Sequence, residues 1–243
     1  MRTFSGLLPY YVVNEFPKSG GTWLAQMLSD ALDVPFRRNA PIRFERSVTH
    51  GHFLYPLGLR NVVVLWRDPR DLLVSFYYHC YFINEHHNST LVSMMKSRCP
   101  FKDYSNIFAN LPYFIRFISE TPVSPRFSWT EFVSVWARRP GTVQTSYAAL
   151  RLNTAMELAR VVHELTGAML NAELAVEIAD RHSFARAQKA AELQKKDGSE
   201  MSFVREGAVG NWQKHFSSDA FAAIRDTGIE NSLNAIHDLV DYK

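Results

Sequence analysis

A short run of small and polar residues near the start of the chain carries the groups that bind an anion. It reads Phe16-Pro-Lys-Ser-Gly-Gly-Thr-Trp-Leu24 and follows an apolar segment. Glycines let a backbone approach a ligand closely, and the unpaired N–H groups of a first helical turn attract negative charge. Lys18 adds a cation, and Ser19 and Thr22 add hydroxyl donors. We therefore predict that this run binds a phosphate.

The flanking segments would place the run between a strand and a helix. Residues 10–16 are rich in aromatic and β-branched side chains, as in a buried strand. From residue 22 to 32, Trp23, Met27, Leu28 and Ala31 recur at helical spacing. The pattern G-x-x-x-x-G-K-[ST] of nucleoside-triphosphate sites is absent, since Lys18 precedes the glycines. This difference argues against an ATPase.

The run Pro17-Lys-Ser-Gly-Gly-Thr-Trp23 resembles the 5′-phosphosulfate motif of the sulfotransferases that use 3′-phosphoadenylyl sulfate (PAPS). The resemblance implies a P-loop-like strand-turn-helix that holds the 5′ side and the base of this cosubstrate. The residues that carry over are Lys18, Ser19, Gly20, Gly21, Thr22 and Trp23.

A second strand-turn-helix unit follows farther along the chain. Residues 61–66 form the clearest buried strand, and a helix is predicted from 72 to about 82, with Asp68 as its cap. Arg67 ends the strand and Ser75 follows eight residues later. This spacing matches the 3′-phosphate motif of the same sulfotransferases, so the resemblance implies that both residues bind the 3′-phosphate.

A third motif lies in the last fifth of the chain. Phe203-Val-Arg-Glu-Gly-Ala-Val-Gly-Asn-Trp212 resembles the family's Arg-Lys-Gly and Gly-Asp-Trp signature. Arg205 and Gly207 are kept and would also bind the 3′-phosphate. Glu206 replaces a Lys, which weakens the hold on the phosphate unless its side chain points to solvent. We predict that residues 194–210 form a lid over the nucleotide.

Tyr147 is a further candidate for the nucleotide site. A strand is predicted over 142–147 and a helix over 153–165. In the family the corresponding strand ends in a Tyr that reaches the adenine. Tyr147 keeps that Tyr but lacks the acids that follow it, so a role as an ordinary core tyrosine is an equal alternative.

His50 is the candidate base, because Ser47-Val-Thr-His50 resembles the family's Lys-Thr-His motif at a strand end. Imidazole titrates near working pH and suits proton abstraction from an acceptor. His52 is the competing candidate, and Val48 stands where the family has a Lys. Lys18 would place positive charge on the leaving phosphate oxygen.

Together the three motifs predict one sulfotransferase domain over residues 1–243, with a central parallel sheet flanked by helices. The resemblance implies that the sulfuryl group of PAPS passes to a hydroxyl or amine, that adenosine 3′,5′-bisphosphate (PAP) is the product, and that no metal is required. Two alternatives are a non-catalytic nucleotide-binding protein and a P-loop kinase. The acceptor could be a glycan, a lipid-linked sugar or an aromatic alcohol, with a saccharide slightly favoured.

Composition restricts the partners and the location. A formal net charge of +3 over 243 residues is too small to indicate a nucleic-acid or membrane partner. The apolar run 6–13 is too short for a membrane span. Cys80 and Cys99 form no disulfide framework, and with His79, His86 and His87 they match no compact zinc pattern. We expect a cytoplasmic protein.

Overall fold

The computed structural model describes residues 10–37, 45–84, 88–195 and 207–240, with the backbone alone for 190–195. The chain divides into two compact units, each built from separate stretches. Unit 1 comprises residues 1–67, 131–183 and 236–243, and unit 2 comprises 68–130 and 184–235. The prediction of one domain therefore stays a prediction.

Unit 1 contains a four-stranded, fully parallel sheet. Its strands are β1 (Tyr10–Glu15), β2 (Ser47–Gly51), β3 (Val62–Trp66) and β4 (Thr142–Ser146), in the order β2-β1-β3-β4. Every residue of β1 and β3 is buried, which explains the apolar sequence of β3 and of the first four residues of β1. The predicted α/β class with a central parallel sheet is confirmed.

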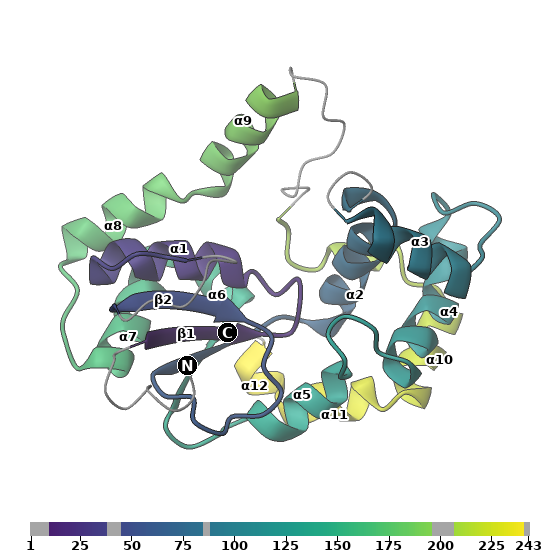
Figure 1. Ribbon diagram of the computed structural model, residues 1–243, viewed down its shortest axis with the longest axis horizontal. Helices are drawn as coiled ribbons and strands as arrows, with labels where there is room; N and C mark the ends of the chain where they lie inside the picture. Colours follow the sequence, from purple (N-terminus) through teal and green to yellow (C-terminus); the bar gives the residue numbers. More distant parts are fainter. Residues whose placement is uncertain (1–9, 38–44, 85–87, 196–206, 241–243) are drawn as a thin grey trace. The chain divides into compact units, whose positions relative to one another are not determined.

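Helices of unit 1 pack on the sheet. The main core joins one sheet face to α1 (Gly21–Leu32), α7 (Thr154–Thr166) and α8 (Ala172–Arg181), and Figure 1 shows α1 running beside β2. Side chains alternate between the two faces along a strand, so Trp66 lies on the other face of the sheet. Its ring contacts Phe132 of α5 (Trp129–Trp136) at 5.4 Å between ring centroids. The short helix α12 (His237–Val240) contacts β4. Both sheet faces are therefore covered.

Unit 2 is helical in its described part. It contains α2 (Pro69–Tyr78), a π-helical turn (His79–Ile83), α3 (Ser89–Arg98), α4 (Ile107–Glu120), α9 (Phe184–Lys195), a 3₁₀ turn (Asn211–Lys214), α10 (Ser218–Asp226) and α11 (Ile229–Ala235). Aromatic rings form much of its interior. The ring centroid of Tyr77 lies 4.8 Å from that of Tyr81 and 5.2 Å from that of Phe114. Burial raises the pKa of Tyr77 to about 12, so its hydroxyl stays protonated.

Two stretches differ from the sequence-based expectation. No helix was predicted between residues 83 and 126, yet α3 and α4 occupy much of this stretch. Tyr147 begins a short helix, α6 (Tyr147–Leu152), instead of ending β4, because Ser146 caps that helix through the amide of Ala149. The C-terminal stretch is divided into three helices, and Gly228, at φ 74°, separates the first two. Within the described residues, no helix combines the length and apolar character needed to cross a membrane.

Candidate active site

The carboxyl ends of the four strands bring the predicted residues of unit 1 to one edge of the sheet. The turn that is predicted to bind phosphate follows β1, His52 follows β2, Arg67 follows β3 and Tyr147 follows β4. In open parallel sheets, ligands bind beyond these carboxyl ends. The parallel register pairs Val13 with His50, so β2 brings His50 beside the start of the turn.

The turn after β1 has the tight backbone that a phosphate-binding loop needs. The amide and hydroxyl of Ser19 both donate to the carbonyl of Phe16, at 3.3 and 2.8 Å. Lys18 and Gly20 adopt left-handed conformations, at φ 75° and 106°. A Cβ at Gly20 would lie 3.0 Å from the ring of Tyr147. Gly20 is therefore required both for the turn and for its contact with Tyr147.

The N-terminus of α1 offers donors to an anion. Its N-cap, Gly20, has no side chain to cap the helix, and the first turn contains no acidic residue. The amide of Gly21 donates to Glu15 Oε2 at 2.5 Å. Within the described part of the chain, no hydrogen bond is found to the amides of Thr22 and Trp23. The positive end of the helix dipole is thus open to a ligand.

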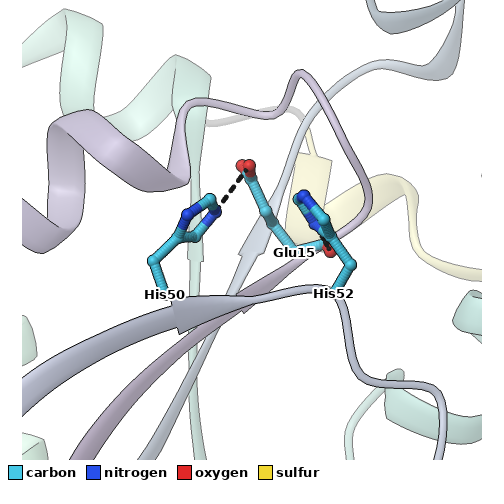
Figure 2. A group of neighbouring side chains, drawn as sticks. All are labelled: Glu15, His50 and His52. Carbon is cyan, nitrogen blue, oxygen red and sulfur yellow. Dashed lines mark hydrogen bonds and ion pairs between the residues drawn. The ribbon is translucent and has the colours of Figure 1, made fainter. Parts of the chain in front are cut away.

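His50 lies against a buried carboxylate, as Figure 2 shows. Its Nε2 is 3.0 Å from Glu15 Oε1, and the two side chains are 11% and 4% exposed. An ionised carboxylate only accepts hydrogen bonds, so Nε2 carries a hydrogen and Nδ1 of neutral His50 keeps its lone pair. A Cβ at Gly21 would lie 2.5 Å from His50 Nε2 and 2.6 Å from Glu15 Cδ. The missing side chain at position 21 makes this close packing possible.

His52 approaches the same glutamate from its main-chain side (Figure 2). Its Nδ1 lies 3.0 Å from the carbonyl oxygen of Glu15. A carbonyl can only accept, so Nδ1 carries the hydrogen and Nε2 keeps a lone pair. The rings of His50 and His52 meet edge to face, with 5.1 Å between centroids. His52 is the exposed member of the group.

Buried hydrogen bonds hold the chain that carries both histidines. Asn14, fully buried in β1, donates to the carbonyl of Phe53 at 3.0 Å and accepts from its amide at 2.8 Å. The indole of Trp136 donates to the same carbonyl at 2.7 Å. These bonds hold the segment after β2 against β1, which determines where His50 and His52 lie.

Arg67 links the turn to Tyr147. One terminal nitrogen donates to the carbonyl of Lys18 at 2.8 Å, and the guanidinium lies 4.4 Å from the ring centroid of Tyr147. Its Nε is buried and has no hydrogen-bond partner among the described residues, which is costly for a charged group. The ring of Trp23 packs on Tyr147 at 5.8 Å between centroids. Arg67, Tyr147 and Trp23 thus border the turn together.

The other predicted residues belong to unit 2 or lie outside the described residues. Ser75 lies in α2, and Gly207 adopts φ 57°. Arg205 and Glu206 fall outside the described residues, as does most of the predicted lid. The structure therefore brings the predicted 5′-side residues and Arg67 to one edge of the sheet, and the binding roles of all the predicted site residues stay predictions.

Two acidic residues were missed as candidates from the sequence. Glu15 was treated as part of a strand, although a charge at the end of an apolar strand, directly before a phosphate-binding turn, signals a function. Asp71 was not among the candidates either. Its buried carboxylate accepts from the amides of Gly210 and Trp212, at 2.7 and 2.9 Å, and so holds the third motif.

The candidate metal ligands in the structure differ from the cysteines and histidines considered in the sequence. Cys80 and Cys99 are buried free thiols, and His86 and His87 lie outside the described residues. The group found among the described residues that could hold a metal ion is Glu15, His50 and His52.

Comparisons with known proteins agree with this architecture. The profile of the sulfotransferase domain family matches residues 59–231. Mouse sulfotransferase SULT7A1 complexed with PAP is similar in structure, with a TM-score of 0.66 and 16% identity over 93% of this chain and 84% of that one. No curated protein sequence matches the chain.

Retinol dehydratase gives two further structural matches. Its complex with androsterone and PAP has a TM-score of 0.59 and 17% identity, over 96% of this chain and 82% of that one. Its complex with retinol and PAP has a TM-score of 0.56 and 16% identity, with the same coverage. These likenesses show the fold. Because the profile match spans well over half of the chain, across both units, the protein belongs to the sulfotransferase family.

Proposed function

We propose that this sulfotransferase moves the sulfuryl group of PAPS to a hydroxyl group of a small acceptor. The observation that carries the proposal is the open N-terminus of α1 after a glycine turn, at the sheet edge where His50 and Arg67 also lie. Its positive electrostatic character suits a phosphosulfate. The PAP-bound sulfotransferase neighbours support the choice of nucleotide.

The residues of the turn fit the cosubstrate. The amides of Thr22 and Trp23 have hydrogens to donate, and Gly20 and Gly21 allow Tyr147, His50 and Glu15 to pack directly against the turn. Lys18 and Arg67 would add positive charge, and Tyr147 and Trp23 would offer rings beside the base. When bound, PAPS supplies the sulfuryl group and leaves as PAP. Ser75, Arg205 and Gly207 remain the proposed ligands of its 3′-phosphate.

His50 is the proposed base, and it would accept the acceptor's proton at Nδ1. Glu15 holds the opposite ring nitrogen at 3.0 Å and so keeps Nδ1 in its lone-pair form. The carboxylate also stabilises the imidazolium that forms, as the acid of a Ser-His-Asp triad does. Lys18, which has a left-handed backbone conformation in the turn, would stabilise negative charge on the leaving phosphate oxygen.

The acceptor is proposed only as a small hydroxyl compound. Retinol dehydratase was solved with androsterone and with retinol, which supports including lipophilic alcohols in an acceptor screen. Saccharides stay in the same screen, because the sequence favours them slightly. Transfer to either class, followed with radiolabelled PAPS, would assign the acceptor.

Thermal stabilisation by nucleotides tests the proposal. The purified protein is heated with PAP or with ADP, each with and without Mg²⁺. A ligand at about one hundred times its dissociation constant adds roughly 2.7 kcal/mol to the free energy of unfolding. We expect stabilisation by PAP that needs no metal, and weaker stabilisation by ADP. Preference for ADP with Mg²⁺ would instead support phosphoryl transfer and overturn the proposal.

A further inference from the structure

Glu15, His50 and His52 form a group with metal-ligand chemistry at the sheet edge. Their donor atoms all lie within 4.8 Å of one another, and they come from the ends of two adjacent strands (Figure 2). Two imidazoles and one carboxylate make a ligand set that proteins use for Zn²⁺ and related ions. The family resemblance did not suggest this group.

Main-chain contacts prepare two of the three ligands. His52 donates its Nδ1 hydrogen to the Glu15 carbonyl, which places the lone pair of the neutral ring on Nε2. Glu15 Oε2 is held by the amide of Gly21, and Oε1 faces the histidines. Such outer hydrogen bonds orient ligands and fix the tautomer of a metal-binding histidine. His50 becomes a ligand when its hydrogen moves from Nε2 to Nδ1, through solvent, without a change of charge.

Burial also favours a cation here. The Glu15 side chain is 4% exposed and already contacts the Gly21 amide and His50, and a cation would add the opposite charge that stabilises a buried carboxylate. His52 is exposed, so an ion can enter from its side. Tetrahedral ligands at about 2.1 Å from zinc lie about 3.4 Å apart. Donors within 4.8 Å therefore need only side-chain adjustments to close around an ion.

The geometry points to a divalent transition-metal site, of the Zn²⁺ class, formed by Glu15 Oε1, His50 Nε2 and His52 Nε2. Three protein ligands leave a fourth position for water. The ion separates His50 from Glu15 and leaves its Nδ1 protonated, so it inhibits transfer. That inhibitory effect rests on the proposed role of His50, whereas binding of the ion does not.

Direct binding measurements test the site without any activity assay. Chelator-treated protein is titrated with Zn²⁺ against a chromophoric chelator, and with Co²⁺ while visible absorption is recorded. We expect one ion per chain and the intense visible bands of four-coordinate Co²⁺. His52→Ala and Glu15→Gln should each weaken Zn²⁺ binding by at least the roughly 10–100-fold that loss of an outer-shell partner costs. His163→Ala, at an exposed position of α7, should leave it unchanged.

Several outcomes would overturn the site. Equal Zn²⁺ affinity for unmodified protein and His52→Ala would place the ion elsewhere. Because His52 is exposed, this variant keeps the test valid even if Glu15→Gln folds poorly. Absence of Zn²⁺ binding while PAP still stabilises the protein would refute the metal site and leave the proposed function standing. Tight Zn²⁺ binding with no stabilisation by PAP would support the metal site and refute the proposed function.

Discussion

Single residues at the end of β1 decide the chemistry of the site. Glu15 contacts the first amide of α1 with one oxygen and His50 with the other. The same carboxylate thus links the turn that is proposed to bind phosphate to the proposed base. A residue that the strand pattern presented as ordinary is therefore central to both proposals made for this sheet edge.

Removal of the two proposed catalytic side chains should abolish most of the turnover. We expect His50→Ala to lower turnover by about 10²-fold or more, because a positioned general base contributes that much. Lys18→Ala should cost a similar factor through lost charge stabilisation. Turnover is measured with radiolabelled PAPS once an acceptor is known, and circular dichroism checks folding.

Matched controls come from exposed residues of the same types. His163→Ala in α7 and Lys102→Ala should keep full turnover. If His50→Ala keeps full turnover and His52→Ala does not, the base is His52. Unchanged turnover in Lys18→Ala would remove Lys18 from its proposed role.

Gly21→Ala should destabilise the protein, although alanine usually stabilises a helix relative to glycine. The new Cβ would lie 2.5 Å from His50 Nε2 and 2.6 Å from Glu15 Cδ, so these side chains must move. We expect a loss of about 1–3 kcal/mol in the free energy of unfolding, measured in urea. The double variant Glu15→Ala/Gly21→Ala should show a smaller loss than the sum of the single changes. Additive losses would mean that the two residues do not compete for space.

Among the elements, the connections that follow the strands hold most of the proposed site residues. Strand-turn-helix units were predictable because apolar strands lead directly into recognisable caps, such as Asp68 for α2. The helices of residues 89–120 were not, since α4 contains Pro112 and many aromatic residues that favour no single local structure. Tyr147 was predicted to end a strand but begins α6. The sequence pattern does not reveal that the Ser146 hydroxyl accepts a hydrogen bond from the Ala149 amide and so caps this helix.

Asp71 should stabilise the connection that carries the third motif. Asp71→Ala would leave the amides of Gly210 and Trp212 without their acceptor, so we expect a loss of about 1–3 kcal/mol in the free energy of unfolding. Amide hydrogen exchange at both positions should accelerate. Asp226→Ala, which breaks an exposed ion pair with Arg116, should cost no more than about 1 kcal/mol. Equal effects of the two changes would contradict the anchoring role.

At the scale of the whole molecule, the fold class could be predicted, whereas the contacts of the acidic residues could not, and the roles of the 5′-side residues stay predictions. Motif spacing located Lys18, His50 and Arg67, because each directly follows or ends a recognisable strand. Glu15 and Asp71 contact residues that are distant in the chain, and local sequence patterns do not predict such contacts. Each of the two compact units likewise combines stretches that are distant in the chain.

The strand order has a practical consequence for anyone who shortens this protein. The family profile starts at residue 59, so a fragment cut at that boundary retains β3 and β4 but lacks β1 and β2. Since β1 lies between β2 and β3, the cut would expose an unpaired edge of β3 along its full length. Such a fragment would be prone to aggregate before any assay could be run. Expression trials should therefore keep residue 10 and everything after it.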